Sequence, residues 1–161
     1  MPIILYRVDE RLIHGQVVIG WGSQLQPNRY LVVDDALAGT EWEQDLYRLA
    51  VSNGTAVTFH SVDDARTRLP EWSSSDERSV LLTRDVETML RLARGGLLGG
   101  QAVNLGGIHH AAGRSRVRSY LYLDDADRGR VRALDEEGVE VSGRDLPGSL
   151  RVSLHDLLEE P

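Results

Sequence analysis

The chain is expected to be an α/β protein, a single-domain, open, mostly parallel twisted sheet of about seven strands with helices on both faces. Two observations predict this class. Short apolar runs typical of buried strands alternate with longer amphipathic segments along almost the whole sequence. The amphipathic segments are long enough to act as the crossovers that parallel strands require. We therefore expect one domain over residues 1–161.

The predicted strands are short runs of aliphatic and β-branched residues, beginning with the apolar segment from Pro2 to Tyr6. In chain order they lie at about 2–7, 30–34, 56–60, 79–83, 101–104, 119–123 and 139–143. The predicted helices between and after them lie at about 15–25, 41–52, 62–69, 85–94, 125–137 and 153–158. This alternation implies right-handed crossovers and a sheet covered on both faces.

Capping signals support several helix boundaries. The candidate N-caps are Thr40 with Glu43 three residues on, Ser61 with Asp64, and Asp124 or Asp125. Gly54 and Gly138 follow helical segments and can take the left-handed conformation that ends a helix. Two segments are expected to be loops: the polar stretch 70–76, and the glycine-rich stretch 95–100, which ends a helix or serves as a flexible interaction loop.

Composition excludes several classes of chemistry. The sequence has no cysteine, which rules out thiolate metal sites and a cysteine nucleophile. All 18 basic residues are arginine, so no lysine is present for a Schiff base or a P-loop. A formal net charge of −7 argues against nonspecific nucleic-acid binding. Neither a signal sequence nor an apolar run of about 18 residues is apparent, so we expect a cytoplasmic protein without direct membrane insertion.

The most informative segment is Arg7-Val8-Asp9-Glu10-Arg11-Leu12-Ile13-His14-Gly15-Gln16-Val17. His14 follows a predicted strand and precedes a predicted helix, so the backbone N–H groups at Gly15 and Gln16 can attract an anion. Arg7 and Arg11 can each offer a planar fork of donors to phosphate oxygens. Asp9 only accepts hydrogen bonds, so it is expected to hold one imidazole N–H and leave the other nitrogen free to attack.

Residues distant in sequence are expected to converge on His14. In an open parallel sheet, ligands collect at the carboxyl ends of the strands. The residues that reach this edge are Asp34, Asp35, Arg84, Asn104, Gly106 and Gly107. We expect Gly106 and Gly107 to let backbone N–H groups approach a phosphate closely, with Asn104 beside them. Arg84 is expected to be either a third cation for the phosphoryl group or a solvated residue at a helix start. Asp34 and Asp35 have two alternative roles. They could hold Arg7 or Arg11 in position, or they could cap a helix.

The pair His109-His110 does not predict a metal site. Adjacent histidines on an extended chain point in different directions, and no further ligand spacing such as His-x-x-x-His is present. We therefore expect no metal. A small metal-dependent hydrolase built on His14, His109 and the aspartates is the weakest of the functional hypotheses for the same reason.

The motif around His14 resembles the phosphorylation loop of the enzyme IIB components of the mannose/fructose/sorbose family of the bacterial sugar phosphotransferase system, which has the form Arg-x-Asp-x-Arg-Leu-Ile-His-Gly-Gln-Val. Further resembling segments are Val32-Val33-Asp34-Asp35, Val103-Asn104-Leu105-Gly106-Gly107-Ile108-His109 and Gly138-Val139-Glu140-Val141. The resemblance covers nearly the whole chain. It places His109 in a loop opposite the active site, where it would shape the site or contact a partner. His110 stands where a tyrosine is expected.

The resemblance implies a protein-histidine sugar phosphotransferase. A IIA phosphohistidine protein would donate a phosphoryl group to Nδ1 of His14, and the group would pass to a sugar bound by membrane IIC and IID partners. No cofactor is then needed beyond the transient phosphoryl group, and the cytoplasmic protein would associate peripherally with the permease. The alternative is a phosphorylatable regulatory or binding module that has the IIB fold but is not coupled to sugar transport.

Overall fold

The computed structural model describes residues 2–51 and 54–159. Its strands are β1 (Ile3–Val8), β2 (Arg29–Val33), β3 (Ala56–His60), β4 (Ser79–Thr83), β5 (Ala102–Leu105), β6 (Ser115–Arg118), β7 (Leu121–Leu123) and β8 (Glu140–Gly143). Its helices are η1 (Gln16–Trp21), α1 (Gly22–Leu25), α2 (Asp35–Ala38), α3 (Glu41–Arg48), α4 (Val62–Ser74), α5 (Val86–Ala93), η2 (Arg94–Gly96), α6 (Asp125–Glu136) and α7 (Leu154–Leu158).

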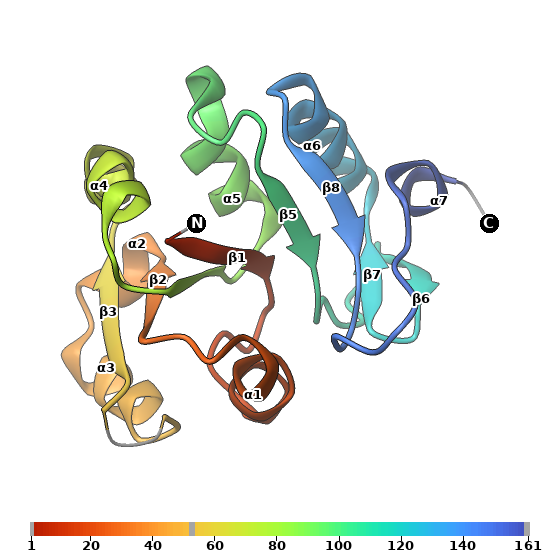
Figure 1. Ribbon diagram of the computed structural model, residues 1–161. Coiled ribbons are helices and arrows are strands. Elements are labelled where there is room, and N and C mark those ends of the chain that lie inside the picture. The colour runs from red at the N-terminus through yellow and green to blue at the C-terminus, as the bar shows by residue number, and fades with distance from the viewer. Residues whose placement is uncertain (1, 52–53, 160–161) are drawn as a thin grey trace.

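The main sheet has six strands in the order β3-β2-β4-β1-β5-β8, and all of its strand pairs are parallel (Figure 1). The strand order reverses at β1, which lies in the interior of the sheet between β4 and β5. The α/β class and the mostly parallel sheet predicted from the sequence are therefore confirmed. Because β1 lies at the reversal, the loop that follows it opens at the edge where ligands of such sheets bind.

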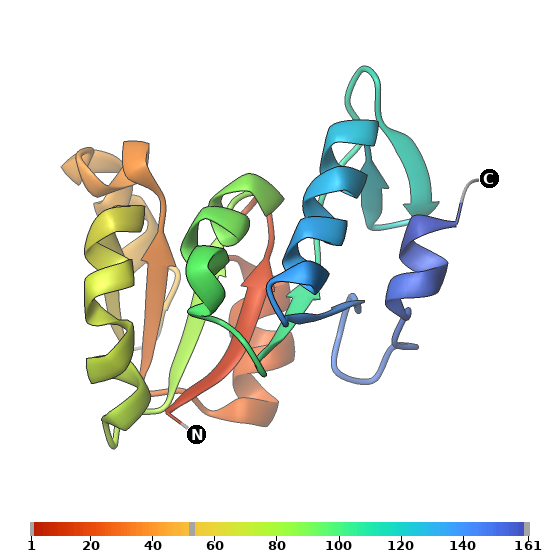
Figure 2. The same cartoon turned by 90° about the horizontal axis from the view of Figure 1, so that it is seen from above.

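Helices cover both faces of the sheet. Helices α4, α5 and α6 lie on one side, and α1 and α3 lie on the other, as Figure 1 shows and the view from above in Figure 2 supports. Two apolar clusters correspond to these faces. The larger includes Tyr6, Val8 and Leu81 with residues of α4, α5 and α6, and the smaller includes Leu12 and Val17 with residues of β2 and α2.

Two predicted features differ from the structure. The segment 119–123 does not join the main sheet, because β7 pairs antiparallel with β6 in a separate two-stranded ribbon. The predicted loop 70–76 is wrong over its first part, since α4 continues to Ser74 with Pro70 inside it. Its buried residues Leu69 and Trp72 keep the chain packed on the sheet, which outweighs the single hydrogen bond that proline removes.

The capping predictions are confirmed in part. The side chains of Ser61 and Asp124 accept hydrogen bonds from the N–H groups three residues on, at 3.1 and 2.7 Å. Thr40 does not cap α3 with its side chain, because its hydroxyl donates to the Ala36 carbonyl at 2.8 Å instead. Gly138 follows α6 with a φ of +83°.

Other boundaries differ by smaller amounts. The predicted helix 41–52 ends at Arg48 in α3, and its last predicted residue, Ser52, lies outside the described residues. Gly54 has the left-handed φ expected of it, +91°, but it does not directly follow the helix. The glycine-rich stretch 95–100 forms a short 3₁₀ turn and further turns, with left-handed φ at Gly95, Gly96 and Gly100.

Candidate active site

The loop between β1 and η1 holds His14 by burying the two residues before it. Leu12 and Ile13 are almost completely buried in the smaller core cluster with Val17. Leu12 has a left-handed backbone with φ of +56°, which costs an L-residue with a Cβ about 1–3 kcal/mol. The apolar anchor thus maintains a strained turn, and the turn sets the position of the next side chain, His14.

The imidazole of His14 is directed at a buried carboxylate. Its Nε2 lies 3.0 Å from Asp9 Oδ2, within ion-pair distance but without the geometry of a hydrogen bond, and Asp9 itself is completely buried. Only 14% of the His14 side chain is exposed. Nε2 is buried against Asp9, and Nδ1 is the ring nitrogen that does not face this carboxylate. This is the orientation expected from the sequence, in which Asp9 holds one nitrogen and leaves the other.

Asp9 is ionised at neutral pH despite its burial. Burial alone would raise the pKa of this carboxyl, but the contact with His14, the charge of Arg7 and the backbone N–H of Arg11 together lower the pKa below its ordinary value. The Arg11 N–H donates to Asp9 Oδ1 at 3.1 Å. A buried negative charge therefore faces Nε2 of His14.

Arg7 holds that negative charge in place from a fully buried position. Its Nε and Nη2 donate to Asp9 Oδ2 at 3.4 and 3.2 Å. Nη1 donates to Asn104 Oδ1 and, at 2.8 Å, to the Arg144 carbonyl, while Nη2 also donates to the Asp145 carbonyl at 3.1 Å. We call this set of acceptors, namely Asp9, Asn104 and the carbonyls of Arg144 and Asp145, the Arg7 cradle.

The cradle corrects the role expected for Arg7. A guanidinium has five N–H donors, and the cradle engages all of them. The Trp21 ring, whose centroid is 5.3 Å from Arg7 Cζ, packs against the same group, and its indole N–H donates to the Asp145 carbonyl at 3.0 Å. Arg7 has no donor left for a phosphate, so the expected phosphate fork at this position is wrong.

Asn104, Gly106 and Gly107 serve the same cradle instead of forming a phosphate nest. The Asn104 side-chain oxygen is engaged by Arg7. A Cβ on Gly106 would lie 2.2 Å from Arg7 Cζ, and one on Gly107 would lie 3.0 Å from Asp9 Oδ1. The Gly106 N–H is also used, since it donates to the Val8 carbonyl at 2.8 Å. Gly106 and Gly107 lie directly against the buried Arg7–Asp9 ion pair, which leaves no room for a side chain at either position.

Arg11, Gly15 and Gln16 form the open side of the site. Arg11 is exposed, and among the described residues its guanidinium makes one hydrogen bond, from Nη2 to Gln16 Oε1 at 3.3 Å. In the part of the chain that the structure describes, no atom outside its neighbouring residues lies within 4 Å of where a Gly15 Cβ would be. The His14 carbonyl accepts from Val17 and Val18 at 3.0 and 2.9 Å, which begins the helical segment immediately after Gly15. An incoming group therefore meets Arg11 and an uncovered backbone.

The carboxyl-edge residues of β2 and β4 are paired with each other and not with the histidine loop. Arg84 lies 3.8 Å from Asp34 and 3.7 Å from Glu43. Asp34 caps α2 by accepting from Leu37 at 2.9 Å. Asp35 accepts from Arg91 Nη1 at 2.8 Å and from the Val62 N–H at 2.9 Å.

These contacts correct one expectation and support its alternative. The prediction that Asp34 or Asp35 contacts Arg7 or Arg11 is wrong. Asp34 lies near Arg84 instead, and Asp35 pairs with Arg91. The helix-capping alternative is what the structure gives for Asp34. Arg84 is therefore a structural link at this edge.

A polar cluster that the sequence did not reveal links His109 to the histidine loop. Arg114 donates to Glu10 Oε1 at 2.5 Å and to the His109 carbonyl at 2.8 Å, and His109 Nδ1 lies 3.4 Å from Glu10 Oε2. His110 packs edge-on against Tyr122, with the ring centroids 5.6 Å apart. Glu10 lies inside the motif, so its position offered a signal. Nothing in the sequence pointed to Arg114, or to the 144–145 backbone.

Within residues 2–51 and 54–159, no group of three or more histidine or acidic side chains is arranged to hold a metal ion. His14 faces Asp9, whereas His109 faces Glu10. In the same described part of the chain, no helix is both long enough and apolar enough to cross a membrane.

Fold and site together define a class: a parallel α/β protein in which the loop after β1 places a histidine, His14, against a buried carboxylate, flanked by an exposed arginine. The chain matches the family model described as "PTS system sorbose subfamily IIB component" over residues 3–161, and it belongs to that family. Membership implies phosphotransfer within the sugar phosphotransferase system, and IIB components of this system are sugar phosphotransferases.

Individual relatives agree with this assignment. The chain is 30% identical over 155 residues to the N-acetylgalactosamine-specific phosphotransferase enzyme IIB component 1 of Escherichia coli K12, covering 96% of this chain and 97% of that protein. It is 30% identical to the mannose-specific EIIAB component of the same strain, covering 99% of this chain and 49% of that protein. The IIBSor domain of the Klebsiella pneumoniae sorbose permease superimposes with a TM-score of 0.87 at 28% identity, covering 100% and 99% of the two chains.

Proposed function

We propose that His14 is the phosphoryl carrier of this IIB component, and that it accepts the group on Nδ1. The observation that carries the proposal is the contact of Nε2 with the buried carboxylate of Asp9, 3.0 Å away, which leaves Nδ1 as the nucleophile. The 11-residue motif that contains both side chains resembles the family's phosphorylation loop.

The chemistry requires alignment and charge stabilisation. A neutral imidazole uses the Nδ1 lone pair to form an N–P bond while the bond between phosphorus and the donor nitrogen breaks. Asp9 stabilises the imidazolium character that develops on the ring, and Arg11 stabilises charge on the phosphoryl oxygens. In the second transfer a sugar hydroxyl oxygen forms a bond to phosphorus while the N–P bond breaks; the hydroxyl proton passes to water, and neutral His14 is released. Arg7 acts on both steps through Asp9 only.

The proposed partners are a IIA phosphohistidine donor and membrane IIC and IID components that bind the sugar. The match to half of a protein named EIIAB supports a donor of the IIA type. In this proposal the chain works in the cytoplasm as one domain over 1–161, and it associates with the permease peripherally. No cofactor takes part beyond the phosphoryl group itself.

The direct test is incubation with phosphoenolpyruvate and the general phosphocarrier proteins of a related bacterium, followed by intact mass measurement and site mapping. We expect one acid-labile phosphoryl group on His14. The variant His14→Ala should take up none, whereas His155→Ala, which changes an exposed histidine on α7, should be labelled normally. Undiminished labelling of His14→Ala would refute the proposal.

The donor is expected to dock over the edge that bears the histidine loop, because in-line transfer requires direct access to Nδ1. NMR titration with an unphosphorylated IIA protein should shift amide signals in 8–16, 34–37, 83–86 and 105–110. The C-terminal segment 150–161 should not respond. Strongest shifts in that segment, or at Trp72, would place the docking surface elsewhere.

A further inference from the structure

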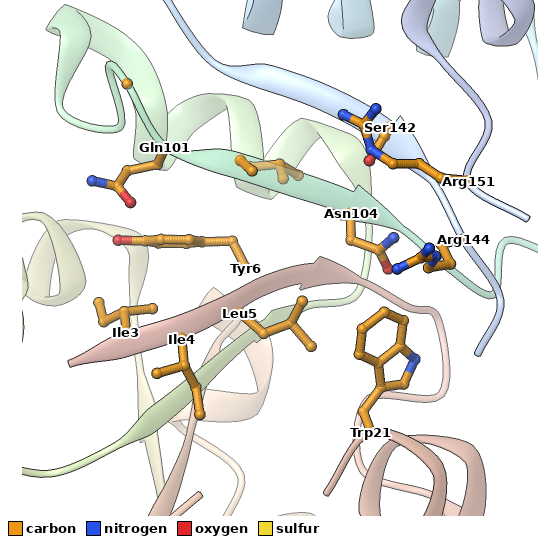
Figure 3. A pocket seen from close by; sticks show the side chains of 13 residues that line it. Ile3, Ile4, Leu5, Tyr6, Trp21, Gln101, Asn104, Ser142, Arg144 and Arg151 are labelled. Carbon is orange, nitrogen blue, oxygen red and sulfur yellow. The ribbon is translucent and has the colours of Figure 1, made fainter. Parts of the chain in front are cut away.

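A pocket of about 520 Å³ lies on the sheet face next to the Arg7 cradle, over β1, β5 and β8 (Figure 3). On β5 and β8 the side chains facing the helices α5 and α6 are buried apolar ones, such as Val103 and Val141. The alternate side chains, Ala102, Asn104 and Ser142, line the pocket, and Val103 contributes to the lining as well. Its volume is in the range of small-molecule sites.

The lining separates an apolar part from a polar part. Ile4, Leu5 and the Trp21 ring lie on the β1 and η1 side, as Figure 3 shows. Asn104, Ser142, Arg144 and Arg151 lie on the β5 and β8 side, and Gln101 lies at the far end.

The two arginines retain donors for a ligand. Arg144 makes one side-chain hydrogen bond among the described residues, from Nε to the Ser149 carbonyl at 3.0 Å, which leaves its two terminal nitrogens. Arg151 is paired through Nη2 with Glu140, so a carboxylate also lies near the pocket, and its Nη1 makes no contact with an acceptor among the described residues. An anion therefore meets two guanidiniums and one carboxylate. Two planar forks suit a phosphate better than a neutral group.

We propose that this pocket binds a small organic phosphate with a saturated ring, of the hexose phosphate class. Arg144 and Arg151 would receive the phosphate, and the amide and hydroxyl groups of Asn104, Gln101 and Ser142 would receive ring hydroxyls. The face of a saturated sugar ring is apolar and packs on an aromatic surface, which Trp21 provides beside Leu5.

The pocket shares two residues, Asn104 and Arg144, with the Arg7 cradle, and a third lining residue, Trp21, contacts Arg7 itself. Asn104 accepts from Arg7 within the cradle and also lines the pocket. Arg144 contributes its carbonyl to the cradle and its side chain to the pocket, and Trp21 packs on Arg7. A ligand here is thus connected to His14 through Arg7 and Asp9. Because such coupling is reciprocal, phosphorylation of His14 and occupancy of the pocket should change each other's equilibrium.

The choice of a sugar phosphate rests on the sugar phosphotransfer that the proposed function assigns to this chain, but binding does not require His14 to react. The test therefore uses the unphosphorylated full chain, titrated with glucose 6-phosphate, mannose 6-phosphate, glucose and inorganic phosphate. Calorimetry and NMR amide shifts report binding. We expect dissociation constants of about 0.1–1 mM for a hexose phosphate, and at least tenfold weaker binding of glucose and of inorganic phosphate.

Variants locate the site. Arg144→Gln and Ala102→Phe, which respectively remove a cation and fill the pocket, should each weaken hexose phosphate binding by at least tenfold. The control Arg132→Gln changes an exposed arginine on α6 and should bind as the wild type does. If circular dichroism shows that Ala102→Phe is unfolded, the binding measured for Arg144→Gln alone tests whether the hexose phosphate occupies this pocket. Shifts of the His14 ring nitrogens on titration, lost in Arg144→Gln, would support the connection to the active site.

Three results would overturn the proposal: no saturable binding at 10 mM hexose phosphate, equal binding by the pocket variants, or equal affinity for inorganic phosphate. His14→Ala separates this proposal from the phosphocarrier function, since it should bind the hexose phosphate yet accept no phosphoryl group. Binding without phosphorylation of the wild type would refute the carrier function alone. Phosphorylation without binding would refute the pocket alone.

Discussion

Replacing Arg7 with methionine should destabilise the whole fold, because Arg7 neutralises a carboxylate that has no access to water. Both Arg7 and Asp9 are completely buried, and their closest approach is 3.2 Å. Methionine keeps an unbranched apolar stem in the same space but removes all five donors. Asp9, Asn104 and two carbonyls then lose the hydrogen bonds that Arg7 donates to them.

The magnitude follows from that geometry. Removing one partner of a buried ion pair costs about 3–5 kcal/mol, out of a total of about 5–15 kcal/mol for a domain of this kind. Urea unfolding should show a midpoint lower by about 1–3 M at an unchanged slope. The double variant Arg7→Met/Asp9→Asn should recover part of the loss, because the uncompensated charge is gone.

The matched control is Arg11→Met, in which an exposed arginine of the same loop is removed. Its free energy of unfolding should stay within about 0.5 kcal/mol of the wild type. A loss below about 1 kcal/mol in Arg7→Met, or an equal loss in both variants, would contradict the structural role assigned to Arg7.

Three further predictions concern the same site. Arg11→Lys keeps the charge but loses the planar fork of donors. The rate of phosphoryl transfer should therefore fall more than about tenfold, which is about 1.4 kcal/mol of barrier, while stability stays unchanged. Equal rates in a rapid-quench assay would show that phosphoryl transfer does not use Arg11. Gly106→Ala places a methyl group 2.2 Å from Arg7 Cζ, so the free energy of unfolding measured in urea should fall by about 1–3 kcal/mol. The control Gly129→Ala lies in α6 with open space around it, and its free energy of unfolding should rise by about 0.5–1 kcal/mol. The lowered pKa of Asp9 stabilises the fold above the ordinary carboxyl pKa of about 3.9, and this stabilisation is lost as the pH falls through the lower folded value. Stability measured from pH 6 to pH 2 should therefore fall less steeply in Asp9→Asn than in the wild type, and parallel curves would contradict the assignment.

The parts of the fold that the sequence revealed are those with a strong local signal. Buried parallel strands are continuous apolar runs, and the six strands of the main sheet were each found close to their observed bounds. The ribbon of β6 and β7 was missed in part because the half-exposed segment Ser115–Arg118 is rich in arginine. The continuation of α4 through Pro70 was missed because its cause, the burial of Trp72, is a tertiary contact.

The site was predictable where its contacts are local. Asp9 and His14 are five residues apart in one motif, and their contact was expected from the chemistry of the two side chains. The role of Arg7 was not, because an arginine that binds phosphate and one that is buried against a carboxylate look the same in sequence. Its acceptors are distant in sequence, Asn104 on β5 and Arg144 and Asp145 just after β8, and only the packing of β5 and β8 beside β1 brings them together.

The Arg7 cradle also has a consequence for the order in which the protein is made. The residues that complete it are 97, 137 and 138 positions further along the chain than Arg7. During synthesis the whole 7–17 motif leaves the ribosome long before these residues do, and a buried ion pair cannot form before its surroundings exist. A nascent chain that stops before β8 would therefore contain every residue of the motif without holding His14 in its reactive orientation. We expect reactivity at His14 to appear only once translation and folding have passed residue 145.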